Sequence, residues 1–409
     1  MYHAIVVGAR CAGAATALLL ARKGYRVLLL DRASFPSDTI SSHFIHPPGV
    51  ARLAAWGLLD RLAATGCPPI HTYTFDLGEF ALSGPAHAAG PSWPAYAPRR
   101  TVLDRLLVEA AVEAGAELRE GVNVTDLCWD GDRVVGVVGR TRTGTRFVEG
   151  ARIVVGADGR HSSVARRVQA PRYHAHPTLT CNYYAYWDGV PVAGAELHQR
   201  DRRFLVAVPT HDALTLVAVI APIRDLSHFQ WDLAAHYHEA LDLAPGLRDR
   251  VRLGRQVEPF RGMASLPNFF RRAHGPGWAL VGDAGHHKDP ITAQGMSDAF
   301  RDAELLAAGL DDAFAGRRPI TEALADYEWR RDEASLPMYR FTLGLARLEP
   351  PPEAMRQLFA ALRHDPVAAS RFLGAAAGTV PISEFFAPDN LERIVGSAPT
   401  AVTGPVEGT

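Results

Sequence analysis

The stretch that most constrains the fold is residues 4–32, whose pattern predicts a strand, a glycine turn, a helix and a second strand. Residues 4–7 are a short apolar run, and residues 14–22 are rich in Ala and Leu without a helix breaker. A second apolar run at residues 27–30 ends in Asp31. The stretch therefore predicts a dinucleotide-binding βαβ unit, in which the unpaired N–H groups of the helix N-terminus face a pyrophosphate.

The glycine turn departs from the usual fingerprint at one position. Gly8 and Gly13 occupy the first and last glycine positions, but the second, where a glycine lets the backbone approach the phosphates, is Arg10. A degenerate turn of this kind can also be only a tight connection. The Arg10 guanidinium could pair with phosphates or point into a cavity beside the cofactor. Asp31, about 20 residues past the turn, would accept ribose hydroxyls.

Composition excludes several classes of protein. With 409 residues and 47% hydrophobic content, the chain can bury a large core and form two or more domains. A formal net charge of −1 favours neither nucleic acid nor an anionic membrane. The four cysteines lack CxxC spacing, so neither a zinc site nor a disulfide framework is expected. No apolar run approaches the ~18 residues of a membrane span, and we expect a cytoplasmic protein.

The segment of residues 33–49 has too many Ser, Pro and His residues for regular structure, so we expect a loop there and a helix at about residues 50–63. His43 and His46 lie three residues apart in the loop. They could contact a cofactor or substrate, or be satisfied within a Pro-rich loop. A metal site is the weakest of these interpretations, and we expect no metal.

Two further apolar runs end in a glycine–aspartate pair. The run at residues 151–155 leads to Asp158 and Gly159. Between the loop at 33–49 and this run we expect an antiparallel strand at 70–82, a loop at 86–98, a helix at 101–115 and short strands at 116–118, 122–127, 134–140 and 146–148. The run at 277–281 leads to Gly282 and Asp283, and residues 289–297 open a helix that extends to 308. Each motif alone is most often a turn.

Together, the three glycine motifs resemble one superfamily, the single-chain flavoprotein hydroxylases with the para-hydroxybenzoate hydroxylase fold and their halogenase and geranylgeranyl reductase relatives. The resemblance covers residues 1–310 and implies an α/β fold. It divides the chain into a discontinuous Rossmann-like FAD-binding domain (residues 1–70, 99–170 and 276–310), an inserted antiparallel-sheet substrate domain (71–98 and 171–275), a C-terminal helical region (311–397) and a flexible tail (398–409).

The resemblance also implies a set of FAD contacts. Arg100, four residues before Asp104 in an R-x-x-L-D pattern, matches an arginine that contacts the cofactor, and the Asp158 motif serves both FAD and pyridine nucleotide. Residues 290–297 would cover the isoalloxazine ring, with a helix N-terminus near the site of negative charge in reduced flavin. The full set is Gly8, Arg10, Gly13, Asp31, Arg32, Arg100, Asp158, Gly159, Gly282, Asp283, Pro290, Gln294, Gly295 and Met296.

In the block that fits the substrate domain, we expect strands at residues 179–187, 203–209 and 214–220 and a helix at 233–243. The first of these strands is unusually aromatic. Because strand side chains alternate, Tyr183 and Trp187 share one face and Tyr184 and Tyr186 share the other. One face should border the flavin cavity, and the pattern does not say which; an aromatic strand can also be plain core.

The reaction implied by the resemblance is that of an FAD-dependent monooxygenase. Reduced FAD would add O2 to give a C4a-hydroperoxide, which hydroxylates an aromatic or other electron-rich small molecule. NADH or NADPH would dock near Asp158 and Arg160, or a separate flavin reductase would supply the electrons. The alternative is a flavin-dependent reductase of an isoprenoid-like or other unsaturated substrate. A halogenase is less favoured, because the W-x-W-x-I-P segment and the active-site lysine of those relatives are absent, and a non-enzymatic flavin module is the remaining class.

Lys288 needs separate scrutiny, because the chain has only one other lysine, Lys23. It could be a solvated residue at a loop edge, or it could point into the cavity with Asp289 holding it, near the reduced flavin or an acidic substrate. The candidate catalytic residues are His43, His46, Lys288, Pro290, Tyr184 and Tyr186.

Overall fold

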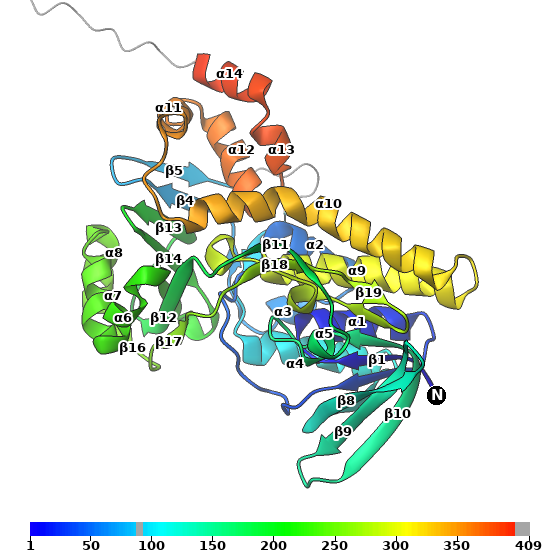
Figure 1. The fold of residues 1–409 in the computed structure, drawn as a ribbon. Coiled ribbons are helices and arrows are strands. Elements are labelled where there is room, and N and C mark those ends of the chain that lie inside the picture. The colour runs from blue at the N-terminus through cyan, green and yellow to red at the C-terminus, as the bar shows by residue number, and fades with distance from the viewer. Residues whose placement is uncertain (87–92, 397–409) are drawn as a thin grey trace, which may run out of the picture.

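The computed structural model describes residues 1–86 and 93–396, and it contains two large sheets with helices packed against them (Figure 1). The first sheet has the strand order β19-β20-β10-β1-β2-β7, and a meander of β8 and β9 extends from β10. Its strands are β1 (Tyr2–Val7), β2 (Val27–Leu30), β7 (Glu117–Arg119), β8 (Val122–Asp130), β9 (Arg133–Thr141), β10 (Arg146–Gly156), β19 (His274–Gly275) and β20 (Trp278–Leu280).

The centre of this sheet is parallel, since β1 pairs in parallel with both β2 and β10. Alternate residues of β1 face opposite sides. Ala4 and Val6 pack with the helices α1 (Cys11–Arg22), α4 (Arg100–Glu113) and α9 (Gly295–Phe314), whereas Ile5 and Val7 pack with the β8–β9 meander. The predicted βαβ unit and the α/β fold class are thereby confirmed.

The second sheet is mostly antiparallel, in the order β16-β12-β15-β14-β13-β4-β5, with β17 beside β12. Its strands are β4 (Tyr73–Asp76), β5 (Ala81–Gly84), β12 (Thr180–Asp188), β13 (Ala195–Arg200), β14 (Arg203–Pro209), β15 (Thr215–Pro222), β16 (Arg255–Gln256) and β17 (Arg261–Met263). One face packs against α6 (Leu226–Trp231), α7 (Leu233–Leu241) and α8 (Pro245–Leu253).

The other face of the second sheet lies toward the C-terminal helices, coloured orange to red in Figure 1. These are α10 (Ile320–Ala346), α11 (Glu353–Leu362), α12 (Pro366–Ala377), α13 (Ile382–Phe385) and α14 (Pro388–Gly396). A small sheet of β11 (Arg172–His176), β18 (Asn268–Arg271) and β21 (His286–His287) joins segments far apart in the sequence, and β3 (Pro69–Ile70) pairs with β6 (Ala95–Tyr96).

Several expected boundaries were wrong. The helix expected at residues 50–63 is two helices, α2 (Pro47–Ala55) and α3 (Leu59–Ala63), because Gly57 takes a φ of +68° between them. The strand expected at 70–82 is mainly the β4–β5 hairpin, and the strands expected at 146–148 and 151–155 are one continuous strand, β10. The tail at 398–409 and part of the loop at 86–98 lie outside the described residues.

The remaining short elements are α5 (Ser163–Arg167), η1 (His211–Ala213), η2 (Ile223–Asp225), η3 (Gly282–Ala284) and η4 (Pro290–Thr292). Among the described residues, no helix is both long enough and apolar enough to cross a membrane.

Candidate functional site

A polar groove of about 870 Å³ follows the carboxyl ends of the parallel strands. Four of its lining residues follow the ends of parallel strands by one to three positions. Gly8 follows β1, Asp31 follows β2, Asp158 follows β10 and Asp283 follows β20. Ligands of open α/β sheets bind at this edge. The groove is therefore the place where a dinucleotide would lie.

The glycine turn has the geometry that a dinucleotide requires. Gly8 has a φ of +102°, and a Cβ on Gly13 would lie 1.7 Å from the Gly8 carbonyl oxygen. No side chain fits at Gly13, so α1 can approach β1 only with glycine there. A Cβ on Gly282, which has a φ of +60°, would lie 2.7 Å from the Cβ of Ala12. The close approach of helix and strand is thus preserved although the second glycine is absent.

The groove presents carboxylates suited to the hydroxyl groups of FAD. Asp31 is held in place by the backbone N–H groups of Ala9 (2.7 Å) and Ala33 (2.8 Å), and a carboxylate keeps acceptor capacity beyond two such bonds. Asp283 lines the groove and has no hydrogen-bond donor among the described residues. These groups and the glycine turn fit FAD.

Arg10 lies beside the groove, where its guanidinium also binds other parts of the chain. Its Nη1 donates to the Asp104 carboxylate at 2.5 Å and to the Ser37 carbonyl at 3.1 Å, and its Nη2 donates to the Asp38 carbonyl at 3.2 Å. Asp104 is completely buried and also binds Arg100 through Nη2 at 2.8 Å. Arg10 thus lines the groove while it ties the loop of residues 33–49 to α4.

Other sequence-predicted cofactor residues have mixed placements. Asp158 Oδ2 accepts from the backbone N–H groups of Ser163 and Val164, so it caps α5 as well as lining the groove. The Gln294 side chain is turned away and donates to the Ala376 carbonyl of α12 at 2.9 Å. The other members of the set line the groove, and they are Arg32, Arg100, Gly159, Gly282, Pro290, Gly295 and Met296.

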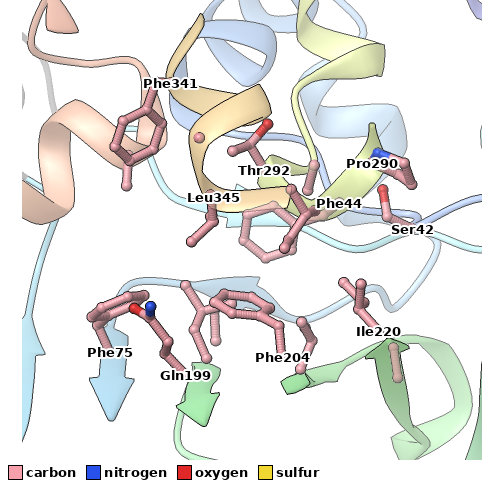
Figure 2. A pocket seen from close by; sticks show the side chains of 18 of the residues that line it. Ser42, Phe44, Phe75, Gln199, Phe204, Ile220, Pro290, Thr292, Phe341 and Leu345 are labelled. Atoms are coloured by element: carbon pink, nitrogen blue, oxygen red, sulfur yellow. The ribbon is translucent and has the colours of Figure 1, made fainter. Parts of the chain in front are cut away.

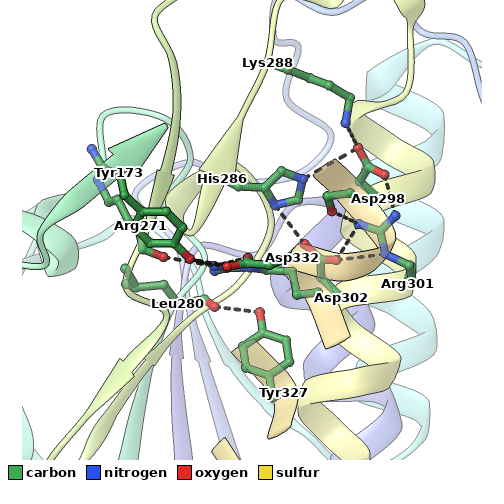
Figure 3. Close-up of polar contacts among 12 residues, drawn as sticks. Tyr173, Arg271, Leu280, His286, Lys288, Asp298, Arg301, Asp302, Tyr327 and Asp332 are labelled. Carbon is green, nitrogen blue, oxygen red and sulfur yellow. Dashed lines mark hydrogen bonds and ion pairs between the residues drawn. The ribbon is translucent and has the colours of Figure 1, made fainter. Parts of the chain in front are cut away.

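Lys288 is buried, so a solvated lysine at a loop edge was the wrong interpretation. It lines the groove and its Nζ forms an ion pair with Asp298 of α9 (Figure 3). Asp289, the expected partner, instead accepts from the Thr180 hydroxyl at 2.6 Å and the Ile291 N–H at 3.1 Å. The counterion of Lys288 was therefore wrongly predicted, although its position beside the groove agrees with the sharper hypothesis.

The Lys288–Asp298 pair belongs to a buried ionic cluster that includes His286, Arg301 and Asp302 (Figure 3). Burial by itself raises the pKa of Asp298, but Lys288 and Arg301 outweigh burial and hold that pKa well below its usual range. Burial likewise opposes protonation of His286, but Asp302 and Asp298 raise its pKa above the ordinary value. The cluster therefore favours positive charge at the edge of the groove.

An apolar cavity of about 680 Å³ lies between the second sheet and the C-terminal helices (Figure 2). Phe75, Phe204 and Ile220 come from the sheet, and Phe341 and Leu345 come from α10 on the opposite side. Its volume is that of a site for a drug-sized ligand.

The groove and the cavity meet at one place. Both are lined by Ile40, Ser41, Ser42, Met263, Pro290 and Ala293. A cofactor in the groove and a ligand in the cavity would therefore share the segment at residues 290–293, which the sequence predicts to cover the flavin ring.

His46 holds this shared segment. Its Nε2 lies 3.0 Å from the Thr292 carbonyl and its Nδ1 lies 3.2 Å from the Tyr73 hydroxyl. Burial lowers the pKa of His46 to about 4, so the ring is neutral at neutral pH, with Nε2–H donating and Nδ1 accepting. His46 is thus placed as a positioning residue for the segment.

His43 and the aromatic strand form a second polar group beside the cavity. His43 Nε2 bonds to the Tyr186 hydroxyl, and the Arg99 guanidinium lies 3.9 Å from the Tyr186 ring centre. Tyr184 lines the cavity. The face of β12 with Tyr184 and Tyr186 therefore lies toward the cavity side, whereas Tyr183 packs on Phe229 in the opposite core.

Sequence reasoning missed Asp298, Tyr73 and Arg99. Asp298 lies ten residues after Lys288, beyond a turn with no regular periodicity that would pair them. Tyr73 and Arg99 come from segments without a chemical motif. The C-terminal wall of the cavity carried one usable signal, an apolar repeat at Phe341, Leu345 and Leu348 with helical spacing.

Comparisons with known proteins agree with this geometry. The family model described as "FAD binding domain" matches residues 1–342. A tryptophan 2-halogenase of Chondromyces crocatus is 24% identical over 79% of this chain and 64% of its own length, so the chain spans less than two thirds of that relative. A rifampicin monooxygenase of Rhodococcus hoagii is 26% identical over 88% of this chain and 75% of its own length.

Among solved structures, the myxobacterial chondrochloren halogenase CndH superposes with a TM-score of 0.79 at 22% identity, covering 92% of this chain and 96% of that one. This likeness shows a shared fold.

Replacing Lys288 by Met should make the flavin harder to reduce without loss of FAD. The change removes a buried positive charge from the groove and leaves Asp298 with Arg301, so negative charge on the reduced ring is less favoured. We expect the two-electron reduction potential to fall by about 30 mV, which is about tenfold in the equilibrium constant. Spectroelectrochemical titration measures it. Lys23→Met is the matched control, because Lys23 is partly exposed and pairs with Asp311 outside the groove; equal potentials in the two variants would contradict the role of Lys288.

Proposed function

Since the chain belongs to the FAD-binding-domain family and is an FAD-dependent oxidoreductase, we propose that it is a monooxygenase that uses NADH or NADPH and O2 to hydroxylate an electron-rich, mainly apolar small molecule. The observation that carries this proposal is the junction of the polar groove with the apolar cavity at Pro290 and Ala293. A substrate in the cavity would lie beside the cofactor in the groove.

Bound FAD would supply the electron transfer from the reductant to O2. The chain supplies the rest. Gly8, Gly13, Asp31 and Asp283 would hold the cofactor, and the apolar lining of the cavity would exclude water and orient the substrate ring.

A proton path beside the cavity supports chemistry on a hydroxyl-bearing ring. Burial, followed by the charges of Arg100 and Arg99, lowers the pKa of His43 well below its ordinary value, so its ring is neutral. His43 Nδ1 is buried without a partner among the described residues, so Nε2 is the ring nitrogen through which His43 meets the rest of the path. Because Nε2 faces the Tyr186 hydroxyl, a proton relay toward His43 would use the tautomer with Nδ1–H, in which the Nε2 lone pair accepts from Tyr186.

Tyr184 continues the path toward the cavity. Burial raises the pKa of Tyr184, and the Ser41 backbone, the charge of Arg261 and the neighbouring Tyr186 hydroxyl partly offset that rise. A proton from a substrate hydroxyl could pass from Tyr184 to Tyr186 and on toward His43.

The reductant would bind where, within residues 1–86 and 93–396, three arginine side chains have no carboxylate ion-pair partner. Arg160 and Arg166 line the groove near Asp158, and Arg271 lies behind them. Burial and the charge of Arg172 lower the pKa of Arg271 to about 10. The charge of Asp158 raises this pKa in part, and the charge of Arg166 lowers it further. Guanidinium groups in this arrangement suit the phosphates of NADH or NADPH. Reduction by a separate flavin reductase remains the alternative source of electrons.

Halogenation is the second candidate function, because a halogenase is among the similar proteins. The lining of the cavity argues against halogenation, because the halogenase relatives carry an active-site lysine and no lysine among the described residues lines this cavity. Lys288 is in the groove and paired with Asp298, and Lys23 pairs with Asp311.

Oxygen-isotope incorporation tests the proposal. The FAD-loaded protein is incubated with NADH or NADPH under 18O2, with chloride or bromide present or absent, and with a panel of two- and three-ring phenols. The proposal predicts NAD(P)H oxidation that a panel member stimulates, and one 18O atom in the product.

Two other results would contradict the proposal, and a third would contradict the part of it that concerns NAD(P)H. A product reduced without O2 would establish the reductase alternative, and a halogenated product without 18O would establish a halogenase. Product formation only when a flavin reductase supplies reduced FAD would remove NAD(P)H from the proposal while retaining oxygenation.

Tyr186→Phe should slow hydroxylation of a phenol about 100-fold at pH 7, the scale of general acid–base catalysis, while FAD content stays unchanged. Its rate should then rise with pH as hydroxide replaces the path, whereas the wild-type rate stays level from about pH 6.5 to 8, because the lowered pKa of His43 keeps that ring neutral there. Steady-state pH profiles measure both. Tyr183→Phe is the control for loss of a cavity-lining hydroxyl, since Tyr183 also lines the cavity but its ring stacks on Phe229, on the face of β12 opposite to Tyr186; parallel profiles for all three proteins would contradict the proton path.

A further inference from the structure

Within the described part of the chain, the charged side chains that line the apolar cavity all come from one short segment. They are Arg340, Arg347 and Glu349, at the end of α10 and just beyond it, and all three are exposed. The other ionisable side chains in this lining are His46, which is neutral because burial lowers its pKa to about 4, and tyrosines with pKa values raised by burial. The cavity thus has charged side chains only at Arg340, Arg347 and Glu349, which we call the rim, and its other described lining residues are neutral.

The rim carries a net positive charge without internal compensation. Neither Arg340 nor Arg347 has a hydrogen-bond or ion-pair partner for its guanidinium among the described residues. Arg347 is seven positions after Arg340 and is the C-cap of α10, with a helical backbone (φ −65°, ψ −25°), so the two residues lie on the same side of this end of the helix, about 10 Å apart along its axis. Most other arginines of the C-terminal helices do have partners; Arg356 pairs with Glu353, and Arg371 pairs with Glu384. Two unpaired guanidinium groups beside one carboxylate attract an anion.

The cavity wall that bears the rim is also the part of the chain that lies largely outside the family match. The match ends at residue 342, whereas the lining continues through Leu345, Met355, Phe359 and Phe372 to Phe386. The family model therefore covers Arg340 of the rim, but neither Arg347 and Glu349 nor most of the apolar roof.

We propose that the substrate is a free amphipathic anion, with an apolar ring system in the cavity and one carboxylate, sulfonate or phosphate group at Arg340 and Arg347. This inference rests on the proposed function, whose substrate class it narrows. The apolar part gains its binding free energy from burial, and the anionic group fixes which end enters first. The end without charge then lies toward Pro290 and Ala293, where the cavity meets the groove.

A matched pair of probes tests the proposal on the FAD-loaded protein. 8-Anilinonaphthalene-1-sulfonate has an apolar ring system with one sulfonate, and N-phenyl-1-naphthylamine has the same rings without it. Equilibrium dialysis at low salt measures the Kd of each. In the double variant Arg340→Gln, Arg347→Gln, we expect the Kd of the sulfonate to rise about tenfold, which is near the upper end of the range for exposed ion pairs. The Kd of the neutral probe should change less than twofold.

Three control variants show whether the effect on binding is confined to the rim. Arg330→Gln removes an exposed charge from the same helix away from the cavity and should leave both probes unchanged. Glu349→Gln removes the carboxylate at the rim and should tighten sulfonate binding about threefold. Ala218→Trp fills the cavity from the floor of the sheet and should weaken both probes; Val206→Phe serves the same purpose if the first variant loses FAD or fails to fold.

Equal weakening of both probes in the double variant would overturn the proposal, as would an equal effect of Arg330→Gln. Binding that survives both cavity-filling variants would also overturn it, because the probes would then bind elsewhere. Dialysis measures binding without turnover. Absence of 18O incorporation would contradict the monooxygenase proposal, whereas the dialysis results test only whether the rim binds an anionic group. The two failures are therefore distinguishable.

Discussion

The contact between Gly13 and the Gly8 carbonyl is the constraint on which the site depends. A Cβ at Gly13 would lie 1.7 Å from that oxygen, so only glycine lets α1 pack directly on the end of β1. With α1 in this position, the parallel strands leave Asp31, Asp158 and Asp283 along one edge. The groove follows from this packing, and Arg10 at the degenerate position is accommodated because Asp104 and the loop at residues 37–38 bind its guanidinium.

A second constraint is the way the segment at residues 289–294 is held between groove and cavity. Five separate parts of the chain bind it, and one is β18, whose Asn268 side-chain oxygen accepts from the Asp289 N–H at 2.7 Å. Thr180 of β12 donates to Asp289, and His46 donates to the Thr292 carbonyl. Thr342 of α10 bonds to the Thr292 hydroxyl at 2.8 Å, and α12 accepts from Gln294. Hydrogen bonds of this one short segment therefore connect the cofactor groove, the second sheet and the C-terminal helices. They explain why Asp289, Ile291, Thr292 and Gln294 are buried although the segment has little regular structure.

The sequence predicts well the features that local chemistry determines. The βαβ unit, the strand ends at Asp158 and Asp283 and the boundaries of β14 follow from periodicity and glycine placement. It fails where distant residues compete for a partner. Lys288 pairs with Asp298 and not with its neighbour Asp289, because Thr180 and the Ile291 N–H already bind Asp289. Periodicity also could not reveal which face of β12 borders the cavity, since both faces are buried and aromatic.

FAD retention by Gly13→Ala tests the central claim most directly. The purified protein and the variant are saturated with FAD and desalted, and the flavin per chain is measured by absorbance after acid release. Gly246→Ala is the control, because a Cβ there meets nothing within 4 Å and Gly246 lies in α8, away from the groove. Far-ultraviolet circular dichroism reports whether each variant folds. We predict near-stoichiometric FAD in the wild type and the control, and at least about a tenfold loss in a folded Gly13→Ala protein, the result of about 1.4 kcal/mol or more. Full FAD retention by Gly13→Ala would contradict the account.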